Sequence, residues 1–112
     1  MQSSVVSSFT FPDQDLLAEV FRGRWKPILW KYNALKTLRV IHKSLWSDRE
    51  VKCIHYILAD KPWKSIPFSD EHPGDYDDLN QWWWNAFNDM GEQMRQSHPA
   101  DWKYMSSHVA AS

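Results

Sequence analysis

The chain has 112 residues, of which 43% are apolar and 15% aromatic, and it contains eight tryptophans. Its formal net charge of −1, from 13 basic and 14 acidic side chains, argues against binding to nucleic acid or to an anionic membrane surface. Cys53 is the single cysteine, which excludes an intrachain disulfide and a thiolate zinc cluster. With no signal-peptide pattern and no apolar run near the roughly 20 residues of a membrane span, the sequence predicts one small cytoplasmic domain.

The first predicted element is a helix that opens near Pro12. Residues 1–9 before it are rich in serine and are predicted to be a disordered lead-in. Asp13 and Asp15 lie near the positive end of the helix, where carboxylates are favoured. Gly23 is a suitable residue for the C-cap. The apolar stripe of this helix comprises Leu16, Leu17, Val20 and Phe21.

The middle of the chain reads as alternating extended and helical segments. Residues 28–32 are predicted to form a short strand or an extended segment, and a helix over about 34–46 follows, with Asn33 as its N-cap. The run Val51–Ala59 is apolar and partly β-branched, which suits a strand buried on both faces. Pro62 ends that strand because it has no N–H to donate. A helix feeding a buried strand predicts an α/β fold with a parallel or mixed sheet.

The last third begins with a loop over residues 64–78 that holds prolines, a glycine and five carboxylates. Apolar side chains at three- to four-residue spacing then predict a long helix over about 79–96. Residues 97–112 are predicted to be a polar tail in which Trp102 and Tyr104 could act as anchors. Two or three strands are too few for a complete sheet, so the sequence predicts an incomplete one.

His55 and Lys61 lie six residues apart, one inside the predicted strand and one just after it. Taken alone, they are well explained as a core histidine and an ordinary loop lysine. The ordered set of motifs around them, however, resembles a known family, and the resemblance covers about residues 9–88. The motifs are Phe11-Pro-Asp-Gln-Asp-Leu-Leu17, Tyr32-Asn33, His55-Tyr-Ile-Leu-x-Asp-Lys-Pro-Trp63 and Asn80-Gln-Trp-Trp-Trp84.

These motifs resemble the C-terminal half of the glycosyltransferase family that contains glycogenin and galactinol synthase, with fungal members closest. The resemblance implies that residues 10–96 are part of a GT-A domain, a Rossmann-like α/β fold. It further implies a retaining hexosyltransferase that uses a UDP-sugar donor, a carbohydrate acceptor and Mn²⁺.

The resemblance also gives roles to individual residues. His55 would be a metal ligand, and Lys61 would meet the donor diphosphate. Asp13 and Gln14 would take the catalytic positions against the transferred sugar. Asn33 would contact sugar or acceptor hydroxyls, although a plain N-cap explains it equally well. Asp13 could likewise serve only as a helix-start carboxylate.

Three departures from the family pattern stand out. The family often has glycine at the position of Leu58, and its glycogenin-like members have aspartate at the position of Thr10. The third departure concerns the strand-terminal Asp-x-Asp that supplies two more metal ligands. An Asp-x-Asp sequence occurs at residues 13–15, where it is predicted to begin a helix, and at residues 75–77, where it is predicted to lie in a loop. One histidine without carboxylate partners holds Mn²⁺ poorly, so the chain alone is predicted to be inactive.

An alternative hypothesis makes the chain a non-catalytic remnant, or an interaction module that contacts a protein partner through its tryptophans. Such a partner could cover the exposed sheet. Trp82, Trp83 and Trp84 could stack on sugar, but packing of the aromatic face of the helix onto the sheet is the simpler interpretation.

Overall fold

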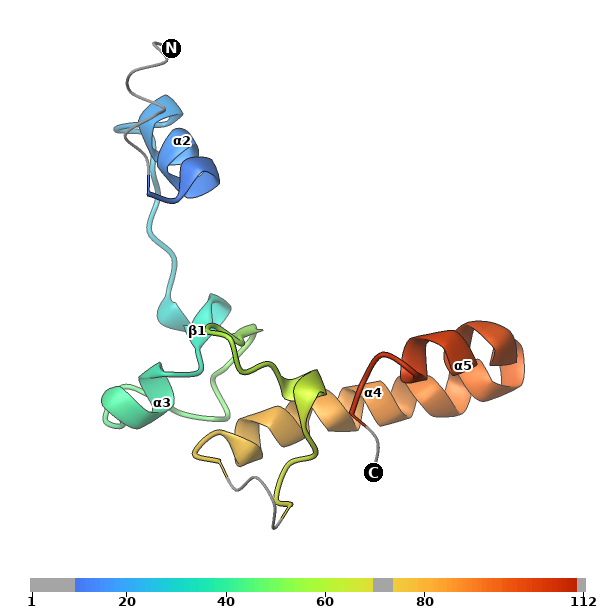
Figure 1. Cartoon of the computed structure of the whole chain (residues 1–112). Coiled ribbons are helices and arrows are strands. Elements are labelled where there is room, and N and C mark those ends of the chain that lie inside the picture. The colour runs from blue at the N-terminus through green and yellow to red at the C-terminus, as the bar shows by residue number, and fades with distance from the viewer. Residues whose placement is uncertain (1–9, 70–73, 111–112) are drawn as a thin grey trace.

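The computed structural model describes residues 10–69 and 74–110, and Figure 1 shows them as an elongated, L-shaped arrangement. The radius of gyration over Cα atoms is 18.6 Å. A compact chain of this length would have a value of about 13 Å. The predicted lead-in, residues 1–9, lies outside the described residues. Three parts follow one another: an N-terminal arm (residues 10–32), a central region (33–69) and a helical hairpin (77–106).

The N-terminal arm contains helix α2 (Pro12–Val20) and the 3₁₀ turn η1 (Trp30–Tyr32). Helix α2 confirms the predicted first helix, and its first turn carries Asp13 and Asp15 as expected. None of its residues is buried. The strand or extended segment predicted at residues 28–32 was wrong for residues 30–32, which form the turn η1, whereas Leu29 is extended. Figure 1 shows α2 projecting away from the remainder of the molecule.

The central region is built on two very short parallel strands, β1 (Ala34–Leu35) and β2 (Ile54–His55). Ala34 lies opposite Ile54 and Leu35 opposite His55. Helix α3 (Leu38–Ile41) lies on the connection between the strands. This parallel pair with a helical crossover confirms the predicted α/β class with an incomplete sheet.

The boundaries predicted for this region were wrong in two places. The helix expected over 34–46 shrinks to four residues, because the backbone N–H groups of Ala34 and Lys36 donate to the carbonyls of Cys53 and His55. The strand expected over Val51–Ala59 shrinks to two residues and is not buried on both faces, since His55 is exposed. A tight turn ends it, in which the N–H of Ile57 donates to the carbonyl of His55 at 2.9 Å.

The hairpin consists of α4 (Asp77–Ser97) and α5 (Pro99–Ser106). Helix α4 confirms the predicted long helix and starts two residues earlier. Helix α5 lies in the segment predicted as a polar tail, and Pro99 occupies its first turn, where a missing N–H costs nothing. Trp102 is the buried anchor of α5, whereas Tyr104 is 70% exposed.

An aromatic cluster holds the hairpin together. Phe87 stacks on Trp83 with ring centroids 4.9 Å apart and meets Trp102 at 4.8 Å. Trp84 completes the buried cluster. Gly91 permits this close approach, because a Cβ there would lie 2.6 Å from the indole of Trp102. The tryptophan run therefore packs within the chain as expected, but the prediction that it packs onto the sheet was wrong. Trp83 contacts Trp63, and the indole N–H of Trp84 donates to the carbonyl of Pro62.

Candidate functional site

The segment from Tyr56 to Asp60 follows β2 and is held by lysines that donate to its backbone carbonyls. The ammonium of Lys61 donates to the carbonyl of Tyr56 at 2.7 Å. Lys64 reaches the carbonyl of Ala59 at 2.9 Å, and Lys36 reaches that of Asp60 at 2.7 Å. These charge-assisted bonds fix the loop that connects His55 to Lys61.

His55 and Asn33 are brought together although 22 residues separate them in the sequence. The Nδ1 atom of His55 lies 3.0 Å from Oδ1 of Asn33. Because a carboxamide oxygen can only accept, Nδ1 carries the hydrogen in this bond, and in the neutral imidazole Nε2 then has the lone pair. His55 is exposed, so this lone pair is accessible to a ligand. Asn33 does not cap a helix, since its oxygen is bonded to the imidazole instead.

The Lys-Pro-Trp motif leads into the 3₁₀ turn η2 (Pro62–Lys64). The prediction that Pro62 ends the strand was wrong, because β2 already ends at His55. Pro62 is fully buried. The indole N–H of Trp84 donates to the carbonyl of Pro62 at 2.8 Å and to that of Ser65 at 3.2 Å. A side chain of α4 thus fixes the turn that follows Lys61.

Leu58 has φ of 76°, in the left-handed region that favours glycine. This is the position where the family often has glycine. The backbone therefore keeps the conformation that glycine would adopt freely, and the leucine carries a strain of about 1–2 kcal/mol.

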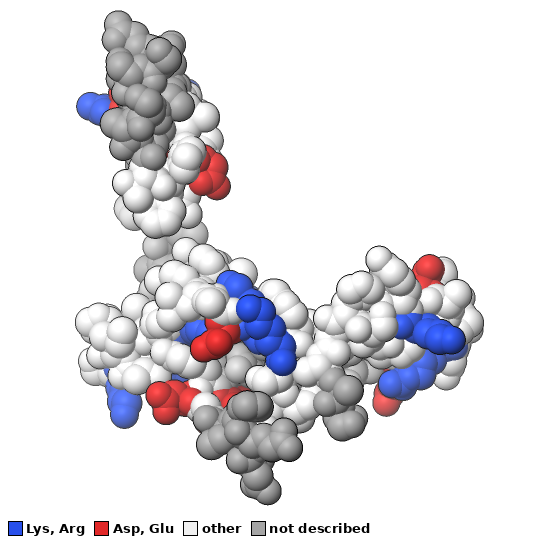
Figure 2. Space-filling model, viewed as in Figure 1, with Lys and Arg blue, Asp and Glu red and all other residues white. Residues whose placement is uncertain are grey.

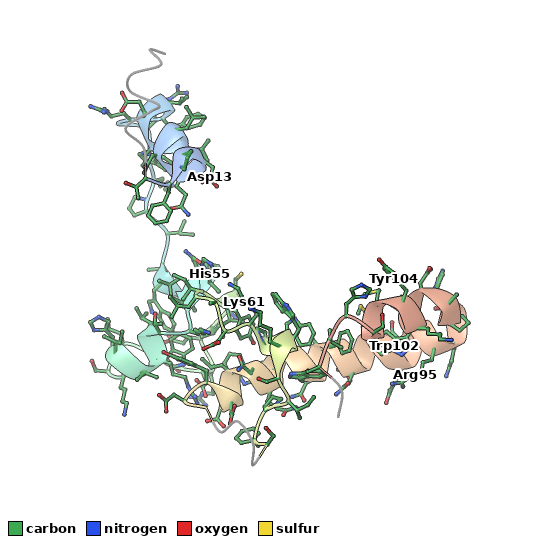
Figure 3. The ribbon with its side chains drawn as sticks, viewed as in Figure 1. Asp13, His55, Lys61, Arg95, Trp102 and Tyr104 are labelled. Carbon is green, nitrogen blue, oxygen red and sulfur yellow. The ribbon has the colours of Figure 1, made fainter. Side chains whose placement is uncertain are left out.

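Asp13 and Gln14 lie on α2, both exposed. Figure 3 shows Asp13 on the N-terminal arm, apart from His55 and Lys61 in the central region. The structure therefore brings Asn33, His55 and Lys61 into one region, and it leaves Asp13 and Gln14 on another.

The fit to a metal ion can be tested on the ligands present. Among the residues that the structure describes, no three His, Cys, Asp or Glu side chains gather closely enough to hold one. Asp77 is committed to its own turn, where its Oδ2 accepts the N–H of Gly74 at 3.1 Å. His55 offers one nitrogen, and Mn²⁺ prefers several oxygen ligands. The described residues therefore do not make a complete manganese site.

Lys36 is a residue of this region that sequence reasoning missed. Its side chain is 1% exposed, and its ammonium lies 4.9 Å from the ring centroid of Tyr76. Burial lowers the pKa of Lys36 below its ordinary value, while Asp60 opposes that shift. Nothing in the sequence indicates this burial, because lysine is among the residues least often buried.

Tyr56 ties the same loop to the hairpin. Its hydroxyl donates to the carbonyl of Leu79 in the first turns of α4. Burial raises the pKa of Tyr56 above its ordinary value. The loop that bears Lys61 is thus fixed both to the sheet, through Lys36, and to α4.

Comparison with known proteins places these motifs in a family. Glycosyl transferase family 8 matches residues 1–67. Galactinol synthase 4 of Arabidopsis thaliana is 30% identical over 95 residues, which cover 81% of this chain and 28% of that protein. Galactinol synthase 1 of Solanum lycopersicum is 32% identical over 83 residues, covering 70% and 26%.

The chain thus spans little more than a quarter of the curated relatives that it matches. No solved structure matches it significantly. None of the helices within residues 10–69 and 74–110 combines the length and apolar character that a bilayer crossing requires. The parallel strand pair is consistent with part of the GT-A fold. The motifs, the fold and the relatives agree, and the chain belongs to glycosyl transferase family 8.

Proposed function

We propose that the chain is part of a nucleotide-sugar-dependent glycosyltransferase and supplies one side of the donor site. The observation that carries this proposal is the hydrogen bond between Asn33 and His55, which leaves Nε2 of an exposed imidazole free to bind a ligand. Lys61 lies on the loop that begins at the same imidazole. The donor is proposed to be a UDP-sugar, and the reaction a retaining hexosyl transfer to a carbohydrate acceptor.

Lys61 suits a diphosphate because its ammonium has three donors, and among residues 10–69 and 74–110 only the carbonyl of Tyr56 uses one of them. The other two can point at phosphate oxygens and stabilise the negative charge that develops on the leaving nucleotide. Asn33 can do two things at once. Its oxygen orients His55, and its amide nitrogen keeps two donors for a sugar hydroxyl.

His55 is proposed as one ligand of Mn²⁺, with the remaining ligands supplied from outside the described residues. A bound metal would contribute electrostatic stabilisation of the diphosphate. Asp13 and Gln14 are proposed to lie against the transferred sugar, which requires that α2 meet a surface that brings it near the donor.

The binding test is calorimetric titration of the 112-residue chain with UDP and Mn²⁺. Because His55 is a single ligand, we expect no binding tighter than about the millimolar range. Micromolar affinity would contradict the proposal that the site needs further ligands. In a complete transferase that carries this segment, His55→Ala should abolish metal-dependent transfer, while the exposed His42→Ala should not change it.

A second readout needs neither metal nor activity. Nitrogen-15 NMR of the neutral imidazole should show His55 protonated at Nδ1, and Asn33→Ala should remove that preference. An imidazole protonated at Nε2 in the unmodified chain would contradict the assigned role of Asn33.

The alternative function, a protein-interaction module, is favoured by one observation. Trp25 is 60% exposed and lies on the arm beside the uncovered stripe of α2. Most other tryptophans pack within the chain, as shown by the pairs Trp30–Trp46 and Trp63–Trp83. The arm is therefore the surface on which this alternative depends.

A further inference from the structure

An apolar cavity of about 420 Å³ lies where the helical hairpin meets the segment after the Lys-Pro-Trp turn. Its walls come from that segment, from one face of α4 and from the residues that follow α5. Six of the residues that line it are apolar, namely Ile66, Pro67, Trp84, Phe87, Val109 and Ala110. Asn33, His55 and Lys61 are not among its lining residues, so this cavity is separate from the candidate donor site. Most of it lies beyond residues 1–67, to which the family match is confined.

One wall of the cavity is fixed by hydrogen bonds and aromatic packing. The indole N–H of Trp84 donates to the carbonyls of Pro62 and Ser65 at 2.8 and 3.2 Å. The ring of Trp84 meets that of Phe87 at 81°, with centroids 5.7 Å apart, and Phe87 packs in turn on Trp102. This wall is therefore formed before any ligand arrives, which lowers the ordering cost of binding.

The opposite wall includes a strap, residues 107–110, that runs back from α5 across α4 (Figure 1). The N–H of Ala110 donates to the carbonyl of Trp63 at 2.9 Å. Within residues 10–69 and 74–110, this is the one backbone hydrogen bond that joins the strap to a segment other than α5. Val109 and Ala110 also pack against the aromatic cluster. Because a single hydrogen bond opens more readily than a ladder of them, the strap is the wall that can admit a ligand.

The lining of the cavity carries no charged side chain. Its polar members are Gln81, Asn88 and Ser106, and no Lys, Arg, His, Asp or Glu is among the described residues that line it. Figure 2 shows the basic side chains of the hairpin gathered toward its far end, with mostly uncharged atoms between them and the central region. A charged ligand would lose its hydration in this cavity without gaining a partner. The lining therefore favours a neutral ligand.

Gln81 supplies one oriented polar group. Its Nε2 donates to Oδ1 of Asn85 at 2.9 Å, which fixes the amide and leaves Oε1 as an acceptor. Aromatic rings pack favourably against Trp and Phe side chains in edge-to-face or offset arrangements. The cavity volume also falls within the range of small-molecule sites, about 300–1,000 Å³. These properties together suit a small aromatic ligand with one hydrogen-bond donor.

We propose that this cavity binds a neutral aromatic molecule of one or two rings that carries one N–H or O–H donor, as indole and phenol do. The rings of Trp84 and Phe87 contact the ligand, Oε1 of Gln81 accepts its hydrogen, and the strap opens to admit it. This site is independent of the proposed transferase function, since it contains none of the residues assigned to that function.

The test is titration of the whole chain with indole, phenol and benzoate, followed by nitrogen-15 NMR of the backbone amides. Indole should bind in about the millimolar range and shift the amides of residues 66–67, 81–88 and 106–110. Benzoate is similar to phenol in size but charged, and it should bind at least about 10-fold more weakly. At ten times the dissociation constant, indole should slow hydrogen exchange of the Ala110 amide by about 10-fold, because the ligand stabilises the closed strap.

Two variants with matched controls test the lining. Ala110→Leu adds three carbons to the cavity and should weaken indole binding at least about 10-fold. Ala100→Leu, the same change on an exposed part of α5, should leave binding unchanged. Gln81→Leu removes the acceptor and should weaken indole binding about 3- to 10-fold, but it should not alter binding of 1-methylindole, which has no N–H. Circular dichroism checks that each variant keeps its helices.

Several outcomes would overturn the proposal. They are the absence of shifts at the cavity amides up to about 20 mM indole, equal affinity for benzoate, and unchanged affinity in both Ala110→Leu and Gln81→Leu. Shifts confined to the arm around the exposed Trp25 would show non-specific stacking instead. Tighter binding of N-acetyltryptophanamide than of indole would assign the cavity to a side chain of a protein partner and overturn a free ligand. Failure of the UDP titration concerns the donor site and would leave this cavity unaffected.

Discussion

The N-terminal arm and the helical hairpin are rich in the same residue types, but only the hairpin buries them. On the arm, Trp25 and Ile28 are 60% and 71% exposed, whereas Trp102 on the hairpin is 9% exposed. Helix α2 has an apolar stripe, none of whose residues is buried by the part of the chain that the structure describes. Helix α4 has α5, and together they close an aromatic cluster.

The difference shows that a helical pattern alone does not bury a helix. An isolated helix of nine residues is marginal in water, because most helical stability comes from packing of the apolar face. In the hairpin, α4 and α5 bury each other's apolar faces. The arm must obtain it from another surface, and both the transferase proposal and the interaction alternative require such a surface.

The largest contrast should come from one substitution made in both regions. Trp102→Ala removes a buried indole and should reduce the free energy of unfolding by about 3–5 kcal/mol in urea titrations. Trp25→Ala should change it by no more than about 0.5 kcal/mol, since the side chain is already exposed. Equal losses would show that the arm is packed, and the contrast between the two regions would be lost.

Gly91→Ala tests how closely the two helices of the hairpin approach. Alanine should gain about 1 kcal/mol of helix propensity, but its methyl group would meet a rigid, buried indole. We expect a net loss of about 1–2 kcal/mol in unfolding experiments. When Trp102 is first replaced by leucine, the same Gly91→Ala change should become neutral or stabilising. A loss that persists in that background would assign the effect to something other than the indole contact.

Leu58→Gly should be stabilising, because glycine removes the cost of a positive φ at an exposed position. The gain should reach about 1 kcal/mol, after subtracting the entropy that glycine loses on folding. Leu29→Gly on the arm is the matched control. Leu29 has similar exposure but an ordinary φ of −64°, so the change should cost about 0.5–1 kcal/mol. Destabilisation at both positions would contradict strain at Leu58.

The smallest effect is expected at Asp48, in a charge cluster that links the central region to the hairpin. The indole N–H of Trp46 and then the guanidinium of Arg39 hold the pKa of Asp48 below its ordinary value of 3.8, and Arg39 also reaches Asp78 on α4. Since the pKa is lower in the folded state, this stability is present above pH 3.8 and is lost as the pH falls through the folded-state pKa.

Acid-unfolding curves check this pH dependence. Asp48→Asn should reduce the loss of free energy of unfolding at acidic pH by a few tenths of a kcal/mol, about the size measured for exposed ion pairs. Glu50→Gln, a change at an exposed carboxylate of the same loop, should leave the pH dependence of the free energy of unfolding unaltered. If the Asp48→Asn variant loses as much free energy of unfolding at acidic pH as the unmodified chain, the titrating group is another residue.

Helix α4 could be predicted because its apolar spacing continues over five turns. The helix expected over 34–46 could not be corrected from the sequence, since Ala34, Leu35 and Leu38 also fit a helical period. Pairing with a strand some 20 residues away decided the structure of Ala34 and Leu35. The local sequence pattern does not indicate such a partner. Helix α5 was missed although Pro99, Asp101 and Lys103 are ordinary start and stop signals.

The candidate site was predictable only in part. Resemblance to a family selected His55, Lys61 and Asn33, and no property of their spacing would have done so. The bond between Asn33 and His55 depends on the register of two strands, which the sequence does not reveal. The burial of Lys36 depends on Asp60 and Tyr76, which lie far from it in the sequence.

The two hydrogen bonds from the indole of Trp84 have a kinetic consequence. They join the carbonyls of Pro62 and Ser65 to the middle of α4, so the Lys-Pro-Trp turn cannot open while that part of the helix stays closed. The turn and α4 should therefore form one cooperative unit in amide hydrogen exchange. A turn that looks like a surface loop in the sequence would then show the protection of a core helix, and Lys61 would keep its position for as long as α4 remains folded.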